Sequence, residues 1–193
     1  MRSTVDHSVE MELDGRTVVT LGDILPARGP LRVLFIGKTP SPASVEAGHY
    51  YQGRMGKGLW KRLDEHGLLH AAPGEFGDDL LLANGFGMTD LCKVPRPFGD
   101  EPTEREYVEG WERVSGVIAA TRPRILTFVY KGALDKVLKY SFGWDHKSEY
   151  GFNDDLMRTF GRRVFAFPLP GVACTLRESK RHLGDLTAAL EVV

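Results

Sequence analysis

Residues 31–44 read Leu31-Arg32-Val33-Leu34-Phe35-Ile36-Gly37-Lys38-Thr39-Pro40-Ser41-Pro42-Ala43-Ser44. The first six residues are almost all apolar, which is typical of a parallel β-strand buried on both faces. The prolines and small residues that follow predict a rigid loop whose backbone N–H groups can approach a ligand closely. Because ligands bind beyond the carboxyl ends of the strands in open parallel sheets, we expect a site at this loop.

Other segments have the patterns of strands and helices. Strand-like runs recur at residues 85–91, 125–130 and 163–167. Between the first two, Thr103 and Glu106 have the spacing of a capping box and predict the start of a helix, which Pro123 ends. A last helix fits residues 178–190, where three leucines share one side.

The order of these segments predicts an α/β fold. Strands that alternate with helices indicate a three-layer α/β/α sandwich with a central, mainly parallel four-stranded sheet. Residues 9–20 add an N-terminal β-hairpin around Asp14-Gly15, a dipeptide that favours a tight turn. The 193 residues suffice for one such domain, so we expect a single domain over residues 1–193 with an accessory hairpin over residues 1–22.

The composition excludes several classes of protein. With 42% hydrophobic and 26% charged residues the chain is an ordinary globular protein, and its net charge of -1 means that any DNA contact must use a local patch. Cys92 and Cys174 form no ligand spacing, so we expect no metal and no organic cofactor. No run approaches the roughly 18 apolar residues of a membrane span, so we expect no membrane partner and an intracellular, cytoplasmic protein.

A resemblance to a known family starts at the same loop. The chain continues with Gly48-His49-Tyr50-Tyr51 and later with Leu59-Trp60. Together with residues 35–40 this segment resembles the first motif of the mismatch-specific uracil and thymine DNA glycosylases, a branch of the uracil-DNA glycosylase superfamily. Residues 85–91, 123–133 and 167–171 resemble the family's other motifs, with residues 131–133 as a lysine-bearing turn, so that the similarity runs from about Leu25 to the C-terminus.

The resemblance implies a monomeric, monofunctional DNA glycosylase of base excision repair. Such an enzyme hydrolyses the N-glycosidic bond of uracil, or of a related damaged or mismatched base, that is flipped out of single- or double-stranded DNA. The reaction passes through an oxocarbenium-like sugar while negative charge develops on the departing base, so the site must hold that charge and position a water molecule. This chemistry requires no metal or cofactor.

The resemblance also assigns roles to individual residues. Thr39 stands where the family has its water-positioning Asn, and its hydroxyl is shorter and supplies only one oxygen. Lys38 and Glu46 are the further catalytic candidates, with solvent-exposed surface charges as the alternative interpretation. Tyr51 is the expected aromatic platform for the base, with a core-packing tyrosine as the alternative. The expected substrate-binding residues are Gly37, Pro40, Ser41, Tyr51, Thr89, Leu169, Pro170 and Gly171.

The remaining residues are expected to bind DNA. Val172, Ala173 or Leu176 would form an apolar wedge, and nearby basic residues would contact phosphates. For the basic residues that begin the last helix, a solvent-exposed helix start is the alternative. The expected DNA-binding residues are Arg54, Lys57, Lys131, Val172, Ala173, Arg177, Lys180 and Arg181.

Three classes of function remain open. The first is an active glycosylase, and the second is a catalytically weak or inactive module that binds a base or lesion in the same pocket. The third is a small-molecule enzyme on the same type of sheet, because fold alone does not determine function. The absence of a Gly-x-Gly-x-x-Gly or Walker loop argues against its nucleotide-cofactor forms.

Overall fold

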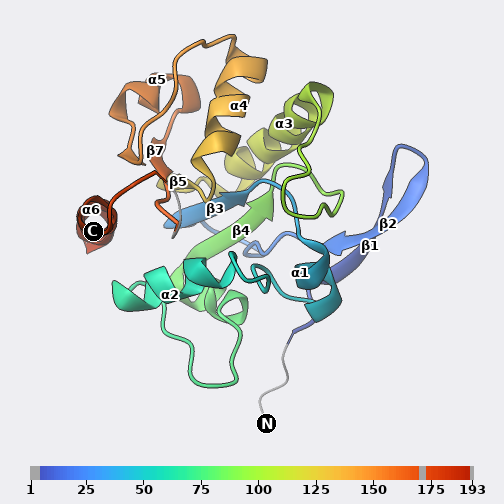
Figure 1. Cartoon of the computed structure of the whole chain (residues 1–193), viewed down its shortest axis with the longest axis horizontal. Coiled ribbons are helices and arrows are strands. Elements are labelled where there is room, and N and C mark those ends of the chain that lie inside the picture. Colours follow the sequence, from blue (N-terminus) through green and yellow to red (C-terminus); the bar gives the residue numbers. More distant parts are fainter. Residues whose placement is uncertain (1–4, 170–172, 192–193) are drawn as a thin grey trace.

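A five-stranded sheet forms the centre of the molecule (Figure 1). The structure, a computed structural model, describes residues 5–169 and 173–191. In spatial order the strands are β4 (Phe86–Asp90), β3 (Val33–Gly37), β5 (Ile125–Phe128), β7 (Arg163–Ala166) and β6 (Gly151–Phe152). The first four are parallel and match the four predicted strands, whereas β6 pairs antiparallel with β7. The predicted four-stranded sheet is therefore corrected to five strands, because a two-residue strand has no sequence period to detect.

Helices cover both faces of the sheet, which confirms the predicted three layers. The helices are α1 (Pro42–Ala47), α2 (Lys57–Glu65), α3 (Glu104–Thr121), α4 (Lys131–Phe142), α5 (Met157–Phe160) and α6 (Leu176–Glu191), with short 3-10 helices η1 (Asp78–Leu80), η2 (Leu82–Asn84) and η3 (Asp154–Leu156). Successive residues of β3 point to opposite faces. Phe35 packs in a core with leucines of α2 and α6, and Ile36 packs in a second core with α3 and α4. Within residues 5–169 and 173–191, no helix has the length and apolar character needed to cross a membrane.

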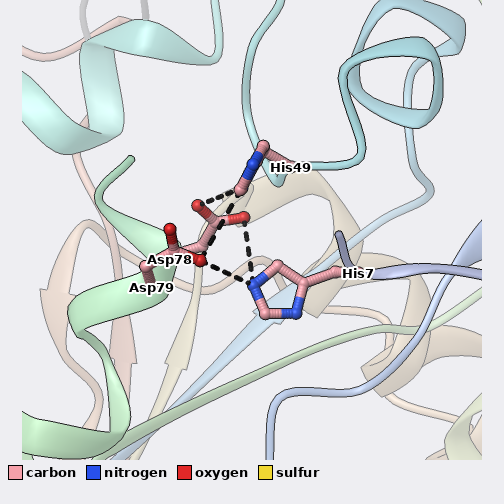
Figure 2. A group of neighbouring side chains, drawn as sticks. All are labelled: His7, His49, Asp78 and Asp79. Carbon is pink, nitrogen blue, oxygen red and sulfur yellow. Dashed lines mark hydrogen bonds and ion pairs between the residues drawn. The ribbon is translucent and has the colours of Figure 1, made fainter. Parts of the chain in front are cut away.

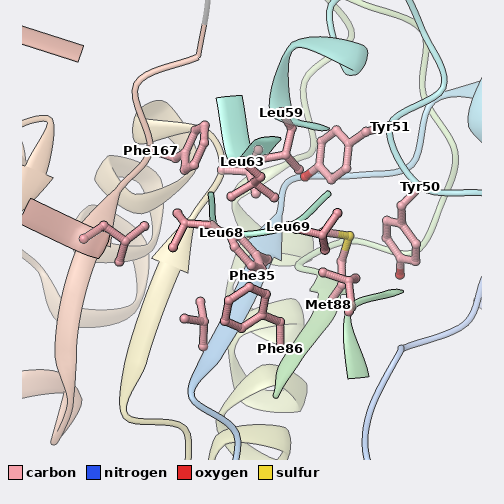
Figure 3. Packing of buried hydrophobic residues seen from close by; sticks show 14 of the residues in the cluster. Phe35, Tyr50, Tyr51, Leu59, Leu63, Leu68, Leu69, Phe86, Met88 and Phe167 are labelled. Atoms are coloured by element: carbon pink, nitrogen blue, oxygen red, sulfur yellow. The ribbon is translucent and has the colours of Figure 1, made fainter. Parts of the chain in front are cut away.

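The first of these cores ends directly beneath the expected site. Figure 3 shows Phe35 and Phe86 from the sheet against Leu63 of α2, with Phe167 and Tyr51 at one edge. Tyr51 is buried, yet its ring lies at the boundary of the cluster. The aromatic residue expected to contact a ligand is thus held by the core on one side.

The predicted hairpin and helix signals are present. β1 (Ser8–Leu13) and β2 (Arg16–Leu21) pair antiparallel, and both turn residues have positive φ angles, 50° for Asp14 and 71° for Gly15. The capping box at Thr103 forms as predicted. α6 begins two residues before the predicted position 178, and residues 131–133, expected as a turn, begin α4.

The chain after the hairpin also reaches the central sheet. Ile24 and Met88 form an isolated antiparallel bridge, with N–H to carbonyl oxygen distances of 2.9 and 3.0 Å. This bridge lies along the outer edge of β4, the first strand of the sheet. The segment that links the hairpin to β3 therefore covers that edge at this point.

Candidate functional site

A cavity of about 550 Å³ lies at the carboxyl ends of β3, β4 and β5. Its walls come from the loop after β3 (residues 38–41), residues 50–56, residues 96–101 and the start of α4 (residues 130–133). This is the end of a parallel sheet at which loops and helix N-termini converge on ligands. The position matches the one expected from the sequence.

The loop after β3 is held by the loop after β4. The carbonyl oxygens of Gly37, Lys38 and Pro40 each accept a hydrogen bond at 2.9 Å from backbone N–H groups of residues 91–96. Among the hydrogen bonds of the described residues, none uses the backbone N–H of Thr39 or Ser41. These two donors at the cavity wall are therefore free to meet a ligand oxygen.

Asp90 and Tyr51 form the floor of the cavity beside Gly37. Asp90 ends β4 and is 2% exposed, and Tyr51, which is 8% exposed, has a left-handed φ of 59°. Within the described residues, Oδ2 of Asp90 and the phenolic oxygen of Tyr51 have no hydrogen-bond partner. Buried polar groups are nearly always paired, so two unpaired ones that line the same cavity point to a polar ligand.

The environment of Asp90 changes its proton affinity. Burial raises the pKa of the Asp90 carboxyl to about 7, although the positive charges of Lys93 and Arg113 act in the opposite direction. Burial also raises the pKa of Tyr51 well above its usual value, and the nearby Asp90 adds to this shift. Near neutral pH the floor therefore holds a neutral phenol and a carboxyl group that gains or loses a proton.

The three predicted catalytic residues have different surroundings. Thr39 lines the cavity, and its hydroxyl donates to the carbonyl oxygen of Val94. Lys38 also lines the cavity and is ion-paired with Glu101. Glu46 is exposed on α1 and is not part of the cavity wall, so the fold does not bring it to the site.

The predicted substrate-binding residues divide into two groups. Pro40, Ser41 and Tyr51 line the cavity, and Gly37 lies beside its floor. Thr89 is buried away from the cavity and donates to Oδ1 of Asp23 at 2.6 Å. A further residue, Leu169, packs in the core beneath the site, whereas Pro170 and Gly171 lie outside the described residues.

The predicted DNA-binding residues are mostly at the surface. Arg54 and Lys131 line the cavity, and Lys131 donates to Asp135 at 2.8 Å. Lys57 is exposed at the start of α2. Among the predicted residues before and within the first turns of α6, those that are exposed are Ala173, Leu176, Arg177, Lys180 and Arg181, whereas Val172 lies outside the described residues.

Several residues that line the cavity are absent from the sequence-based prediction, and Asp90 and Phe98 are the two that matter most for its chemistry. Asp90 follows Thr89 in β4, and successive side chains of a strand point to opposite faces. The assignment of Thr89 to the site therefore implies that the side chain of Asp90 points away from it. A carboxylate at the end of a buried strand was the available signal. Phe98 lines the cavity and is 93% exposed. Its position between Pro97 and Gly99, both turn-forming residues, was a weaker signal for an exposed loop.

Comparison with known proteins identifies the superfamily. A family model described as the uracil DNA glycosylase superfamily matches residues 26–187. The match covers the sheet, the cavity walls except for Leu21, and most of α6, and leaves β1 and β2 outside. A search of curated proteins finds no significant match.

Proposed function

Because the chain belongs to the uracil DNA glycosylase superfamily, we propose that it hydrolyses the N-glycosidic bond of uracil, or of a related damaged or mismatched base, extruded from DNA into the cavity. Membership of the superfamily supports glycosylase activity and DNA as the partner. The preference for such a base, its extrusion and a monomeric role in base excision repair are the proposal. The observation that carries it is the pair of unpaired polar groups at the cavity floor, Asp90 and Tyr51.

The floor suits the edge of a pyrimidine. A protonated carboxyl places one donor and one acceptor side by side, which complements the O4 and N3–H of uracil. Asp90 lies at the buried end of the cavity, whereas the sugar of an extruded nucleotide stays attached to DNA at the mouth. We therefore assign Asp90 to the base edge and not to the attacking water.

The charge that develops during the reaction also needs the protonated form. Cleavage leaves negative charge on the base, and an ionised Asp90 would repel it. The free N–H groups of Thr39 and Ser41 supply donors for a base carbonyl oxygen, as the backbone donors of an oxyanion site do. Binding and anion stabilisation therefore come from the same end of β3 and β4.

The direct test uses oligonucleotides that each contain one uracil, one mismatched thymine or no modification. After incubation with the purified chain, alkali cleaves the strand at any abasic site. We expect cleavage only at the position of the uracil or of the mismatched thymine. A chain that releases no base from any of these substrates yet binds DNA with a steep salt dependence is a binding module. A chain that shows no DNA binding even at low salt contradicts the assignment of DNA as the partner.

One observation favours low activity as the second candidate. The proton of the Thr39 hydroxyl is donated to the carbonyl oxygen of Val94, so toward a water molecule this oxygen can act only as an acceptor. A catalytically weak module that binds the same base in the same cavity is consistent with this geometry.

Thr39→Asn tests this second candidate. The amide of Asn can donate one N–H to Val94 and keep its second N–H and its oxygen for the water, so that it can donate to the water as well as accept from it. We therefore expect kcat to rise by about tenfold or more, up to the roughly 10²–10⁴-fold that a positioned acid–base group contributes. Single-turnover base release measures the effect, and Thr39→Val, which removes the hydroxyl at similar volume, is the control. If Asn, Val and the parent are equal, position 39 does not position the water.

Phe98 is expected to contact the DNA at the mouth of the cavity. Its exposed ring borders the opening, and Arg96, which is ion-paired with Asp100 and Glu106, anchors the same loop. Stacking on a nucleobase is worth about 1–3 kcal/mol, so Phe98→Ala should weaken binding of a uracil-containing oligonucleotide about 5- to 150-fold.

Fluorescence anisotropy at fixed salt measures this change. Met157→Ala, which removes a half-exposed side chain on α5, is the matched control and should leave affinity unchanged. Equal affinities for the two variants would show that the ring of Phe98 does not contact DNA.

A further inference from the structure

Four possible metal ligands from three separate parts of the chain meet outside the cavity. They are His7, His49, Asp78 and Asp79, and Figure 2 shows their side chains pointing toward one another. One ligand atom from each lies within 4.8 Å of the other three. None of the four residues lines the cavity, so they belong to a different site.

The spacing of these atoms fits a small cation. Nε2 of His7 lies 3.2 Å from Oδ1 of Asp79, and Nδ1 of His49 lies 3.1 Å from Oδ1 of Asp78. Nε2 of His7 also lies 3.9 Å from the other carboxylate oxygen of Asp78, Oδ2, and Nδ1 of His49 lies 3.9 Å from Oδ1 of Asp79. A tetrahedral Zn²⁺ with bonds of about 2.0–2.1 Å has ligand-to-ligand distances of about 3.3 Å, between these values. Because all four ligand atoms lie within 4.8 Å of one another, shifts of about 1 Å or less in the side chains would let them surround such an ion.

The charges of the cluster also call for a cation. The side chain of Asp78 is fully buried, that of His49 is nearly so, and the adjacent Asp79 is mostly covered. A buried carboxylate beside a second, mostly covered one is costly unless a positive charge compensates them. Two neutral imidazoles, two carboxylates and one divalent cation together form a neutral centre, and this donor set suits Zn²⁺.

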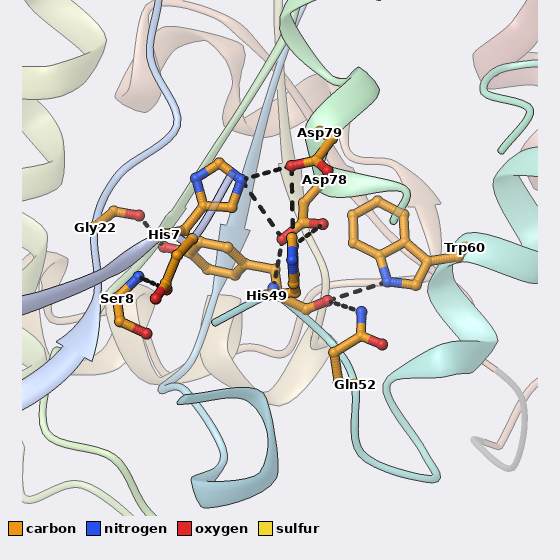
Figure 4. A network of polar contacts seen from close by, with 10 residues as sticks. His7, Ser8, Gly22, His49, Gln52, Trp60, Asp78 and Asp79 are labelled. Carbon is orange, nitrogen blue, oxygen red and sulfur yellow. Dashed lines mark hydrogen bonds and ion pairs between the residues drawn. The ribbon is translucent and has the colours of Figure 1, made fainter. Parts of the chain in front are cut away.

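Further contacts hold the ligands in place (Figure 4). Oδ2 of Asp78 accepts the backbone N–H of Tyr50 at 2.6 Å, and the carbonyl oxygen of Tyr50 accepts the indole N–H of Trp60 at 3.1 Å. The ring of His49 stacks on Phe76 with centroids 3.5 Å apart. Hydrogen bonds to ligating groups orient them in known metal sites, and this cluster has such support.

We propose that these four side chains form a structural Zn²⁺ site whose coordination positions are all filled by the protein. The ion joins the segment before β1, the segment before Tyr51 and the start of η1. The backbone of His7 already donates to the carbonyl oxygen of Gly48 at 2.9 Å, so the first two segments are in contact. Because His49 precedes Tyr51 by two residues, the site fixes the backbone from which Tyr51 reaches the cavity. The proposal does not depend on which base is released.

The test uses the full chain without an affinity tag that binds metals. Elemental analysis of dialysed protein should give about one zinc per chain, and the chelated protein should take up Co²⁺ with the strong visible absorption of a tetrahedral centre. Zn²⁺ at a hundredfold excess over its dissociation constant should raise the Tm by about 5–10 °C. We expect His7→Ala, the most accessible imidazole ligand, to lower zinc affinity more than about 100-fold.

His70→Ala is the matched control, because His70 pairs with Asp64 at 2.5 Å but is exposed and distant from the cluster in sequence. It should bind zinc as the parent does. The Co²⁺ spectrum is measured on the unsubstituted protein. The test therefore still decides the proposal if a variant fails to fold. A parent that takes up no Co²⁺, or a Tm that zinc and chelator leave unchanged, overturns the proposal and leaves a hydrogen-bonded cluster of histidines and carboxylates.

Discussion

The kcat/KM of the unsubstituted protein for uracil-containing DNA should fall about tenfold per pH unit above pH 7, whereas the kcat/KM of Asp90→Asn should not change over the same range. The carboxyl pKa is about 7, so the donor–acceptor form predominates below that pH and the ionised form above it. An amide offers the same donor and acceptor at every pH. Asp90→Leu, which offers neither, should lose about 10²–10³-fold in kcat/KM. Base release measured from pH 5.5 to 9 gives all three profiles.

The two variants separate base recognition from activation of water. If Asp90 removed a proton from the water, Asp90→Asn would be as inactive as Asp90→Leu, and the assignment to the base edge would be wrong. Asp145→Asn makes the same chemical change at an exposed position and should keep the parent profile.

Stability provides a second measurement at Asp90. Burial in the folded state raises the pKa of the Asp90 carboxyl from its ordinary value of 3.8 to about 7. The folded state therefore binds more protons than the unfolded state between these values, and the free energy of unfolding should decrease as pH rises from about 4 to 7 and then level off. Asp90→Asn should therefore be more stable than the parent at pH 8 by a few kcal/mol, since each pKa unit corresponds to about 1.4 kcal/mol. Urea denaturation of both proteins at pH 5 and pH 8 measures this difference.

Gly37→Ala should abolish base release, with a loss of about 10³-fold or more. A methyl group at this position would overlap Oδ1 of Asp90 and lie 2.6 Å from the phenolic oxygen of Tyr51. Both floor groups would have to move, and misplacement by about 1 Å costs on the order of 10²-fold even for one group. Overpacking in a dense site should also lower the free energy of unfolding by about 1–3 kcal/mol. Single-turnover kinetics and thermal unfolding measure the two effects.

Gly116→Ala is the control for this substitution. Gly116 lies on the exposed side of α3, and a methyl group there meets nothing within 4 Å. The change should increase stability by about 0.5–1 kcal/mol, because alanine favours a helix, and should leave base release unchanged. If Gly37→Ala behaves like Gly116→Ala, the floor is not as tightly packed as its geometry indicates.

The parts of the fold predicted from the sequence are those set by local interactions. The capping box at Thr103, the Asp14-Gly15 turn and the apolar run of β3 each act within a few residues. β6 has two residues and depends on its pairing with β7, so no sequence pattern predicts it. Residues 131–133 begin a helix because α4 packs on α3 and the sheet, although a glycine at position 132 weakens the local signal.

The site was predicted less completely, for a related reason. The loop after β3 and Tyr51 could be placed at the cavity from their motif, whereas the choice between Thr89 and Asp90 required the direction of each side chain on β4. The cluster around His49 joins positions 7, 49, 78 and 79, and the sequence indicated no metal site because such ligands share no local spacing. Long-range contacts decide both features.

The bridge between Ile24 and Met88 has a consequence for how copies of this protein behave at high concentration. An open strand at the border of a sheet exposes unpaired N–H and C=O groups, which are templates for intermolecular pairing and aggregation. Ile24 occupies these groups at Met88, and at the opposite border β6 is only two residues long. Both borders of the sheet are thereby blunted, which protects the folded chain from association through added strands.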